Sequence, residues 1–356
     1  MCDKCGYFCG LTKNQIMQKV LVTGGCGYIG SHTLVDLIDH GFDVISIDNL
    51  SNSDETPLQS IRKITGKRVR NYKVDLCDLK KTRAVFEKNP GIAGIIHFAA
   101  LKSVEESVFQ PLRYFHNNNE SLVNILACAE EFGVPHFIFS SSCSVYGNAD
   151  ELPVTEATPF KEAECPYART KQMGEKMIAD FTKITPAVKA VLLRYFNPAG
   201  AHESALIGES PRNKATNLVP VITETAIGKR PSMTVFGTDY DTRDGSCVRD
   251  YVHVMDLAQA HTACLLYLMN NKNTEACEVF NVGIGEGVTV LEAVHAFEKV
   301  TGQKLNYLLG PRRAGDVMAI YANIHKAKNR LGWRPQRGID EIMRTAWAWE
   351  LARSKQ

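Results

Sequence analysis

The sequence lacks three features that would each place it in a separate class of protein. No apolar run approaches the roughly 20 residues that a membrane-spanning helix needs, and the first residues lack the apolar core of a signal peptide. Opposite charges nearly balance, with 41 lysines and arginines against 39 aspartates and glutamates, and no long basic run is interleaved with aromatic residues. We therefore expect a cytoplasmic protein with no membrane and no nucleic acid among its partners.

Cysteine is not scarce, but its pattern is not that of a disulfide framework. The 11 cysteines are odd in number and scattered through predicted strands and helices of a 356-residue chain, which favours reduced thiols. Three of them, Cys2, Cys5 and Cys9, lie in a tail, residues 1–16, before the first predicted strand. Half of a metal site is one interpretation, but no fourth ligand is nearby, so we favour a frayed tail and expect no bound metal.

A glycine-rich turn follows the first predicted strand, residues 19–23. Gly24, Gly27 and Gly30 are spaced as G-x-x-G-x-x-G ahead of a helical pattern, and a second predicted strand ends at Asp48, eighteen residues after Gly30. Glycines let the backbone approach a pyrophosphate, which the N-terminus of the helix stabilises. The carboxylate is placed to bind a ribose diol and to repel a 2′-phosphate. This order of elements predicts a binding site for NAD rather than NADP.

A second group of polar residues follows another predicted strand, residues 137–139. This strand runs into small hydroxyl residues that include Ser142, and further on Pro166 is typical of a helix start, which places Tyr167 and Lys171 on one helical face. A phenol has an unperturbed pKa of roughly 10, but a nearby cation favours the phenolate, and a serine hydroxyl can share the proton. The trio suits proton abstraction from an alcohol. A chance surface pair is the alternative, and the upstream nucleotide motif makes it the weaker one.

Strands alternate with helical patterns through the first part of the chain, which predicts an α/β fold with a doubly wound parallel sheet of the Rossmann type. We expect His97 to be a packed residue of the strand that continues into Ala99–Lys102. After residue 195 the regular alternation of strands and helical patterns changes. We therefore predict an NAD-binding domain over 17–195 and a smaller mixed α/β substrate domain over 196–356, with some strand exchange between the two.

The second part of the chain places arginines beside strand or turn signals. Arg249 lies between Val248 and Tyr251, and Arg313 lies in a Gly- and Pro-containing segment. Guanidinium groups bind phosphate oxygens bidentately, so arginines from two elements can clamp a diphosphate. Surface ion pairing is the alternative. The polar segment 202–216 resembles a loop over a pocket.

Five ordered segments carry a specific likeness: 23–32 (TGGCGYIGSH), 48–53 (DNLSNS), 97–99 (HFA), 194–202 (RYFNPAGAH) and 248–257 (VRDYVHVMDL). Together they resemble signatures of the UDP-glucose 4-epimerases, in the extended short-chain dehydrogenase/reductase family. The resemblance extends over nearly all of residues 19–349. It implies a homodimer, an NAD cofactor and a UDP-galactose or UDP-glucose substrate in the cleft between the domains.

The resemblance also implies roles for individual residues. The catalytic set is Ser142, Tyr167 and Lys171. The implied cofactor-binding residues are Gly24, Gly27, Tyr28, Ile29, Gly30, Asp48, Asn49, Leu50, Ser51, Asn52, Ser53, Asp75, Leu76, Phe98, Ala99, Ala100, Leu101, Lys102, Asn117, Ser142, Tyr167, Lys171 and Phe196. The implied substrate-binding residues are Ser142, Tyr167, Asn197, Asn217, Leu218, Phe236, Arg249, Arg313, Asp316 and Ile320.

In the implied reaction Tyr167 takes the proton of the sugar 4-hydroxyl while NAD takes the C4 hydride. The 4-keto sugar then turns over and receives the hydride on its other face. Dehydratases and decarboxylases of the family carry acidic residues after the catalytic hydroxyl, where this chain has Cys143 and Ser144. A dehydratase is therefore a distant alternative. An NAD-dependent nucleotide-sugar dehydrogenase, which would need free NAD exchange, is another, and a non-catalytic nucleotide-binding regulator is a third, which the presence of Ser142, Tyr167 and Lys171 disfavours.

Two positions depart from the pattern or leave the sugar open. Residues 168–170 read Ala-Arg-Thr where Gly-Lys-Ser is commoner, although the spacing of Tyr167 and Lys171 is kept. Ile320 occupies the position that gates the sugar 2-substituent in the family, between the small residues that admit N-acetylhexosamines and the large aromatics that do not. We expect a preference for UDP-glucose and UDP-galactose. A UDP-N-acetylglucosamine or dual-specificity epimerase is the alternative.

Overall fold

The structure is a computed structural model, and it describes residues 17–212, 214–313 and 317–355. The first helices and strands are β1 (Lys19–Thr23), α1 (Tyr28–Asp39), β2 (Asp43–Ile47), α2 (Thr56–Thr65), β3 (Arg70–Tyr72), α3 (Leu79–Glu87), β4 (Ile92–His97), α4 (Val104–Phe109), α5 (Pro111–Glu131), β5 (His136–Ser140), the 3₁₀ turn η1 (Cys143–Tyr146), α6 (Pro166–Ile184), β6 (Lys189–Tyr195) and β7 (Asn197–Ala199). They are followed by α7 (Leu218–Ala226), β8 (Met233–Phe236), β9 (Val248–Arg249), β10 (Tyr251–His253), α8 (Val254–Met269), β11 (Cys277–Val282), β12 (Val288–Thr289), α9 (Val290–Thr301), β13 (Tyr307–Gly310), β14 (Ala319–Ile320), the π-helical turn η2 (Ala327–Leu331) and α10 (Ile339–Arg353).

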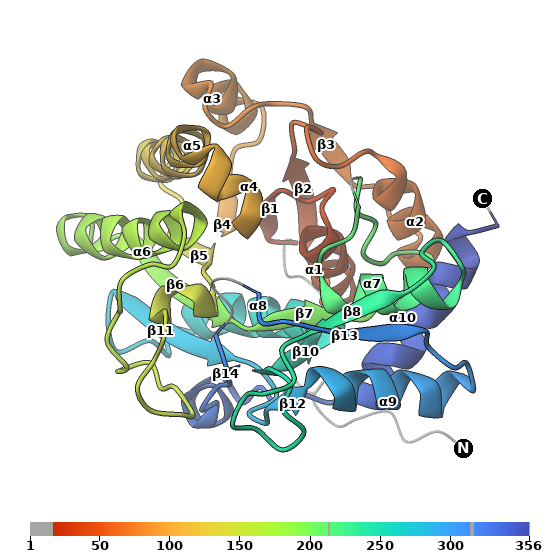
Figure 1. Ribbon diagram of the computed structural model, residues 1–356. Coiled ribbons are helices and arrows are strands. Elements are labelled where there is room, and N and C mark those ends of the chain that lie inside the picture. Colours follow the sequence, from red (N-terminus) through yellow and green to blue (C-terminus); the bar gives the residue numbers. More distant parts are fainter. Residues whose placement is uncertain (1–16, 213, 314–316, 356) are drawn as a thin grey trace.

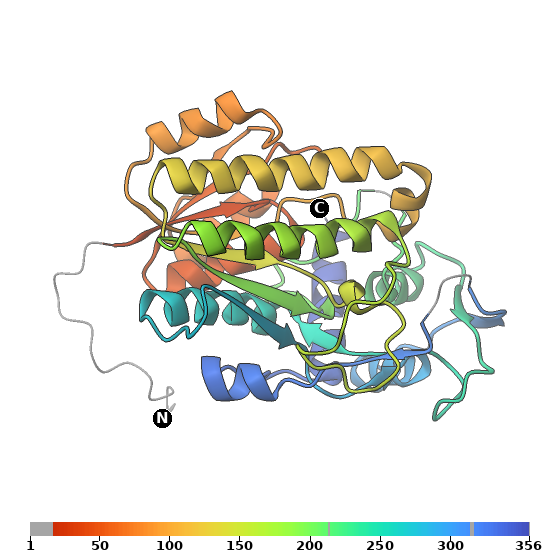
Figure 2. The same ribbon diagram turned by 90° about the vertical axis from the view of Figure 1, so that its left-hand side faces the viewer.

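A seven-stranded parallel sheet organises the molecule, in the order β11-β6-β5-β4-β1-β2-β3. Successive residues of its strands point to opposite faces, and both faces are buried. Val20 and Val22 of β1 belong to the core that includes residues of α1 and α8, whereas Leu21 belongs to the core that includes residues of α3, α5 and α6. The helices α5 and α6 run side by side along one side of this sheet (Figure 2). The predicted doubly wound α/β fold is confirmed.

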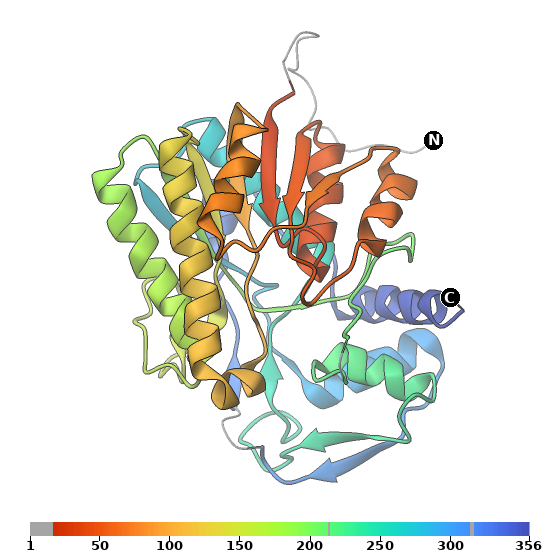
Figure 3. The ribbon, with the colours of Figure 1, turned by 90° about the horizontal axis from the view of Figure 1, so that it is seen from above.

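A smaller region lies beyond the carboxyl ends of these strands. It contains the two-stranded pair β13-β8 and the three-stranded sheet β12-β9-β14, with α7, α9 and α10 packed nearby (Figures 1 and 3). Its core gathers apolar residues of α7, α9 and α10, among them Ile222, Phe297 and Met343. The strand β11 comes late in the chain and yet completes the large sheet beside β6. The two regions are therefore joined through the sheet as well as through the main-chain connection.

Three boundaries in the structure differ from those that the sequence pattern favours. The segment Val74–Leu76 is typical of the end of a third strand, but β3 ends at Tyr72. The asparagines 117–119 are typical of a helix start, but α5 begins at Pro111, because proline suits the first helical turn, where its missing N–H costs nothing. The pattern of 235–240 predicts a short strand, but β8 stops at Phe236, because Gly237 turns the backbone into the left-handed region, with φ +70°.

The described residues include neither a membrane-spanning helix nor a cluster of metal ligands. Among residues 17–212, 214–313 and 317–355, no helix is long and apolar enough to cross a membrane. The same part of the chain holds no group of three or more His, Cys, Asp or Glu residues arranged to bind a metal ion. The cysteine-containing tail, residues 1–16, lies outside the described residues.

Candidate functional site

The glycine-rich turn packs so tightly that most side chains are excluded from it. A Cβ atom on Gly30 would lie 2.2 Å from the carbonyl oxygen of Gly24, and one on Gly24 would lie 3.0 Å from the backbone nitrogen of Ala99. Gly24 also has φ +71°, which favours glycine. The turn leads directly into α1, whose first backbone N–H groups have no partner within the helix. This is the geometry of a phosphate cradle.

Asp48 lies at the end of β2, beside this turn. Its Oδ2 accepts a hydrogen bond from the backbone N–H of Cys26 at 3.1 Å, and its Oδ1 accepts from the backbone of Leu50 and the hydroxyl of Ser53, both at 2.9 Å. The carboxylate is buried. It therefore fixes the segment 49–53 against the glycine turn, which brings the predicted ribose-binding residues into one place.

The residues at and after the end of β4 lie at the same edge of the large sheet. His97 is buried, with its Nδ1 2.8 Å from the hydroxyl oxygen of Thr23, and burial lowers its pKa to about 3. It is a packed strand residue, as predicted. Beyond it the backbone N–H of Leu101 donates to the side chain of Asn118 in α5 at 2.8 Å, and Lys102 forms an ion pair with Glu209 at 3.5 Å.

The catalytic candidates come from two elements that meet beyond β5. Ser142 precedes η1 and its Oγ accepts from the backbone N–H of Ser144 at 3.2 Å. Tyr167 and Lys171 lie on the first turns of α6, and all three side chains are buried. The Lys171 ammonium donates to the carbonyl oxygen of Ser140 at 2.7 Å and lies 5.9 Å from the centre of the Tyr167 ring.

Burial dominates the electrostatics of the trio. It raises the pKa of Tyr167 well above its ordinary value, and the hydrogen bond to Ser142 opposes this rise. Burial lowers the pKa of Lys171 to about 8, and the Glu175 carboxylate opposes this fall. In the chain by itself burial has the larger effect on the pKa of Tyr167, and the Lys171 ammonium donates to the Ser140 carbonyl.

The arginine candidates lie in the smaller region, close to other predicted substrate residues. Arg249 of β9 is paired in register with Ile320 of β14, and its Nη1 donates to the carbonyl of Val317 at 2.7 Å. The Arg313 guanidinium lies 5.8 Å from the centre of the Phe236 ring. Phe236 is 42% exposed, so its ring is accessible from solvent.

Two asparagines of the predicted substrate set lie at element starts. Asn197 opens β7, and its side-chain oxygen is buried without a hydrogen-bond partner among the described residues, which is typical of a ligand site. Asn217 is the residue before α7, with Leu218 next to it, and it donates to Glu209 at 2.7 Å. Asp316 lies outside the described residues.

Comparison with known proteins places this geometry in a family. A family model described as GDP-mannose 4,6 dehydratase matches residues 21–346. The UDP-glucose 4-epimerase of Bacillus subtilis is 44% identical over 333 residues, which are 94% of this chain and 97% of the relative. The Drosophila melanogaster UDP-glucose 4-epimerase is 44% identical over 337 residues, 93% of this chain and 96% of the relative. The chain belongs to the UDP-glucose 4-epimerase family.

Solved epimerase structures share the fold. A Stenotrophomonas maltophila UDP-glucose-4-epimerase with bound NAD and formylated UDP-arabinopyranose matches with a TM-score of 0.92 and 40% identity, over 95% of this chain and 99% of that chain. The Bifidobacterium longum UDP-glucose 4-epimerase in complex with NAD+ and UDP matches with a TM-score of 0.89 and 42% identity, over 95% and 99% of the two chains. The extended short-chain dehydrogenase/reductase fold inferred from the sequence is thereby confirmed.

The epimerase chain also contains site residues that the sequence did not single out. Glu209 bridges Lys102 and Asn217, and Arg212 donates to the backbone carbonyls of Leu50 and Ser51 at 3.4 and 3.3 Å. Both come from the loop over 202–216, and no motif marks them. Glu175 contacts the strand end before Ser142, and its spacing from Lys171 by one helical turn was a signal that could have found it.

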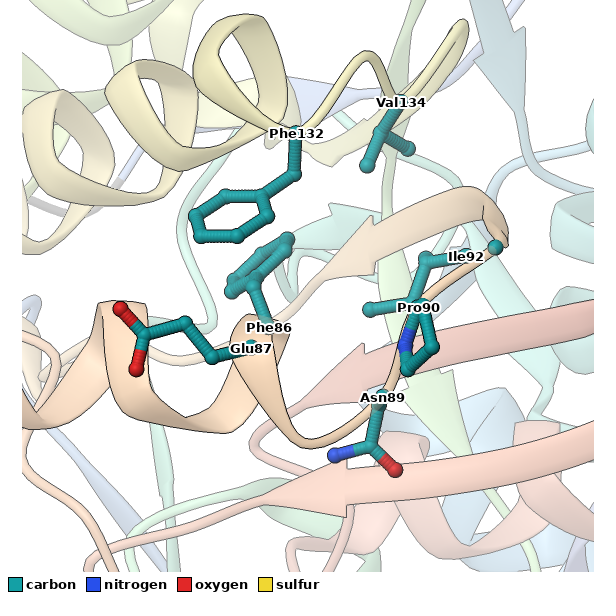
Figure 4. A pocket seen from close by; sticks show the side chains of 8 residues that line it. Phe86, Glu87, Asn89, Pro90, Ile92, Phe132 and Val134 are labelled. Carbon is teal, nitrogen blue, oxygen red and sulfur yellow. The ribbon is translucent and has the colours of Figure 1, made fainter.

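A hollow of about 160 Å³ lies away from this site, at the amino ends of β4 and β5. It is lined by residues that include Phe86, Asn89, Pro90 and Phe132 (Figure 4). The amide of Asn89 is already used, since it donates to the carbonyl of Val85 at 2.7 Å. The hollow lies at the opposite end of the strands from the site described above.

Proposed function

We propose that this chain is a UDP-glucose 4-epimerase that interconverts UDP-galactose and UDP-glucose through a 4-keto intermediate, with NAD held tightly between turnovers. The observation that carries the proposal is the meeting of Ser142, Tyr167 and Lys171 at the carboxyl edge of the sheet, in a chain of this family. The predicted glycine turn lies at the same edge.

The residues present fit a dinucleotide. The turn at Gly24 and Gly30 has no room for side chains, and the buried Asp48 carboxylate orders the segment that would receive the adenosine ribose. We assign the remaining cofactor contacts to residues that follow β3 and β4 or lie on α5, namely Asp75, Leu76, Phe98, Ala99, Ala100, Leu101, Lys102 and Asn117. NAD, when bound, supplies the hydride acceptor and donor. The chain supplies binding, orientation and proton transfer.

Tyr167 is the group that moves the proton. Its phenol oxygen would accept the proton of the sugar 4-hydroxyl and later return it, with Ser142 sharing the hydrogen bond. Because burial raises the pKa of the phenol, the phenolate needs added positive charge nearby to form at neutral pH. The Lys171 ammonium, held at the Ser140 carbonyl, is the nearby cation that the chain itself provides.

The smaller region would hold the UDP group. Arg249 and Arg313 are the cationic candidates for the diphosphate, and the exposed ring of Phe236 is a flat surface for the base. Asn197 brings a buried amide oxygen that still needs a partner. Binding energy placed on UDP, which both epimers share, leaves the sugar free to present either face to the cofactor.

Ile320 bears on the choice of sugar. It is buried at 7% exposure in an apolar cluster with Phe196, Tyr146 and Val154, and Cys143 packs against the same cluster. A branched side chain packed in this way resists the addition of an N-acetyl group beside it. We infer a preference for UDP-glucose and UDP-galactose. A Campylobacter jejuni relative described as a UDP-Glc/GlcNAc 4-epimerase, 37% identical, keeps dual specificity as the alternative.

The deciding experiment is turnover without added cofactor. Purified protein incubated with UDP-galactose alone should reach an equilibrium mixture with UDP-glucose. No conversion, together with net NADH formation after NAD is added, would instead indicate a nucleotide-sugar dehydrogenase. Equal kcat/KM values for the hexose and the N-acetylhexosamine nucleotides would support the dual-specificity alternative.

We also propose a homodimer formed through α4, α5 and α6. These helices carry large exposed apolar side chains, namely Val104, Val108, Phe109, Leu112, Val123 and Met173. An exposed apolar surface of this kind favours association with a second copy. Sedimentation analysis should give twice the chain mass of 39.5 kDa. The cytoplasmic location and the division into domains near residue 195 stay predictions.

A further inference from the structure

A buried carboxylate continues the catalytic face of α6. Tyr167, Lys171 and Glu175 are spaced four residues apart, so they lie one above another along the helix. Glu175 is only 3% exposed. Arg194 of β6 binds the Glu175 carboxylate through two nitrogens. Its Nη2 donates to Oε2 at 2.7 Å, and its Nε donates to Oε1 at 2.9 Å. A forked pair of this kind holds both side chains in one orientation.

The same ion pair contacts side-chain hydroxyls on both sides of Ser142. The hydroxyl of Ser141, the residue before it, donates to Glu175 Oε1. On the far side, the Nη1 of Arg194 donates to the hydroxyl of Tyr146 in η1 at 3.0 Å. In the chain, Ser142 therefore lies between two residues that both contact the buried ion pair of Glu175 and Arg194. Glu175 belongs to α6, the helix that carries Tyr167 and Lys171.

Glu175 also lies one helical turn from Lys171, and its charge raises the pKa of that ammonium. The titratable groups that act on Lys171 or are acted on by it include Glu175 and Tyr167 from α6 and His97 from β4, while β5 contributes the Phe139 ring and the Ser140 carbonyl. Burial lowers the pKa of His97 and raises the pKa of Tyr167, which disfavours the charged form of each. Glu175 is thus the negative charge in this group that opposes loss of the Lys171 proton.

We propose that Glu175 is a positioning residue for the epimerase reaction, which aligns Ser142 with α6 through Ser141 and Arg194 and keeps Lys171 protonated. The inference rests on the proposed function and deepens it. Glu175 does not contact the substrate in this account. Its hydrogen bonds act on the position of Ser142, and its charge acts on Lys171. Different substitutions can therefore remove the two effects separately.

The test is the pH dependence of kcat in Glu175→Gln. Loss of the carboxylate should lower the pKa of Lys171 further below about 8, so activity should fail at lower pH than in the wild type. We expect the alkaline limb of the pH profile, where kcat falls as the pH rises, to move about one pH unit lower in the variant. The ratio of wild-type kcat to variant kcat should therefore be roughly tenfold larger at pH 8.5 than at pH 6. Glu175→Asp, which keeps the charge, should return the limb toward its wild-type position.

A second variant keeps the test valid if an unpaired Arg194 prevents folding. Glu175→Gln combined with Arg194→Met removes both charges together, and neutral replacement of a buried ion pair is often tolerated. Its alkaline limb should also move to lower pH, but by less than in Glu175→Gln, because loss of the Arg194 charge opposes the loss of the carboxylate. The matched control is Gln172→Ala. Gln172 is equally buried on α6 and donates to the η1 carbonyl of Val145 at 2.9 Å, but it carries no charge. It should lower thermal stability without moving the limb.

Each outcome decides one of the two proposals. A wild-type chain that does not convert UDP-galactose rejects the proposed function. If the wild type is active and the alkaline limb stays in place both in Glu175→Gln and in the double variant, the proposed role of Glu175 is overturned. The same is true if Gln172→Ala moves the limb as far as Glu175→Gln does, since the effect would then be general loosening of α6 against η1.

Discussion

The proposed cofactor region and the proposed UDP region of this molecule differ in the groups that line them. The first is made mainly of backbone, since glycines at Gly24 and Gly30 exclude side chains and the Asp48 carboxylate accepts three hydrogen bonds from neighbouring groups. The second is made of side chains on short strands and turns, with Phe236 exposed and an amide oxygen of Asn197 unpartnered.

This contrast fits the two tasks of an epimerase. A site whose hydrogen bonds are already made is rigid before its ligand arrives, so little ordering is needed on binding and the ligand is held tightly. A site of exposed side chains can open and close at each turnover, as exchange of UDP-sugar requires. Four substitutions test whether retention of NAD and exchange of substrate are separated in this way.

The largest effect is expected where the two regions meet, at Tyr167. Tyr167→Phe removes the proton-transferring hydroxyl and keeps the ring, so kcat should fall roughly 10³-fold, within the range of general acid–base catalysis. Bound NAD, measured in the purified protein, and the Kd for UDP, measured by calorimetry, should both stay close to wild type. A variant that also loses NAD would show that the tyrosine is needed to build the cofactor region.

The next effect concerns the backbone-built region. Gly30→Ala places a Cβ 2.2 Å from the Gly24 carbonyl, and relief of that overlap must shift the turn. We expect protein purified with little bound NAD and a loss of about 1–3 kcal/mol in the free energy of unfolding, typical of overpacking. The matched control is Gly338→Ala, where a Cβ meets nothing within 4 Å and φ is −87°. Equal NAD content in both variants would contradict a preformed cradle.

Removal of a cation from the side-chain-built region should act on substrate alone. Arg249→Ala should raise KM for UDP-galactose by roughly tenfold to a hundredfold, because a hydrogen bond to a charged group contributes about 1.5–3 kcal/mol. NAD content should not change. Arg344→Ala is the control, since Arg344 is an exposed partner of Glu341 within α10 and such pairs contribute little. Loss of NAD from Arg249→Ala would erase the distinction between the regions.

The smallest effect is expected at the loop that connects the two regions. Arg212 is exposed and donates to carbonyls of the segment after Asp48, at Leu50, Ser51 and Ser53. Arg212→Ala should speed release of NAD several-fold, consistent with about 1 kcal/mol for such bonds, and leave kcat unchanged. Exchange of bound NAD for labelled NAD measures this rate.

Lys214→Ala serves as its control, because Lys214 is an exposed cation in the same loop. If both variants release NAD at the wild-type rate, the loop does not contribute to retention. If both release it faster by the same factor, the general positive charge of the loop matters, and the contacts of Arg212 do not.

The fold and the cofactor edge were predictable because their signals are local. A strand followed by glycines, a helix and an acidic strand end needs only a few dozen residues to be recognised, and the alternation of strands with helices then implies parallel order. The start of α6 at Pro166 was predictable for the same reason. Boundaries were missed where one local signal was weighed over another. Asn118, which was assigned to a helix start, lies within α5, because the helix already begins at Pro111.

The sequence by itself predicted the nucleotide turn and the proposed catalytic trio, because these are encoded by residue types at short spacing. Only the tertiary structure decided which groups act on that trio. The pairing of Glu175 with Arg194, the reach of Arg212 to the segment after Asp48, and the burial that raises the pKa of Tyr167 join residues that are far apart in the chain or depend on what surrounds them. Such effects arise from distance and solvent exclusion in three dimensions, which no short spacing records.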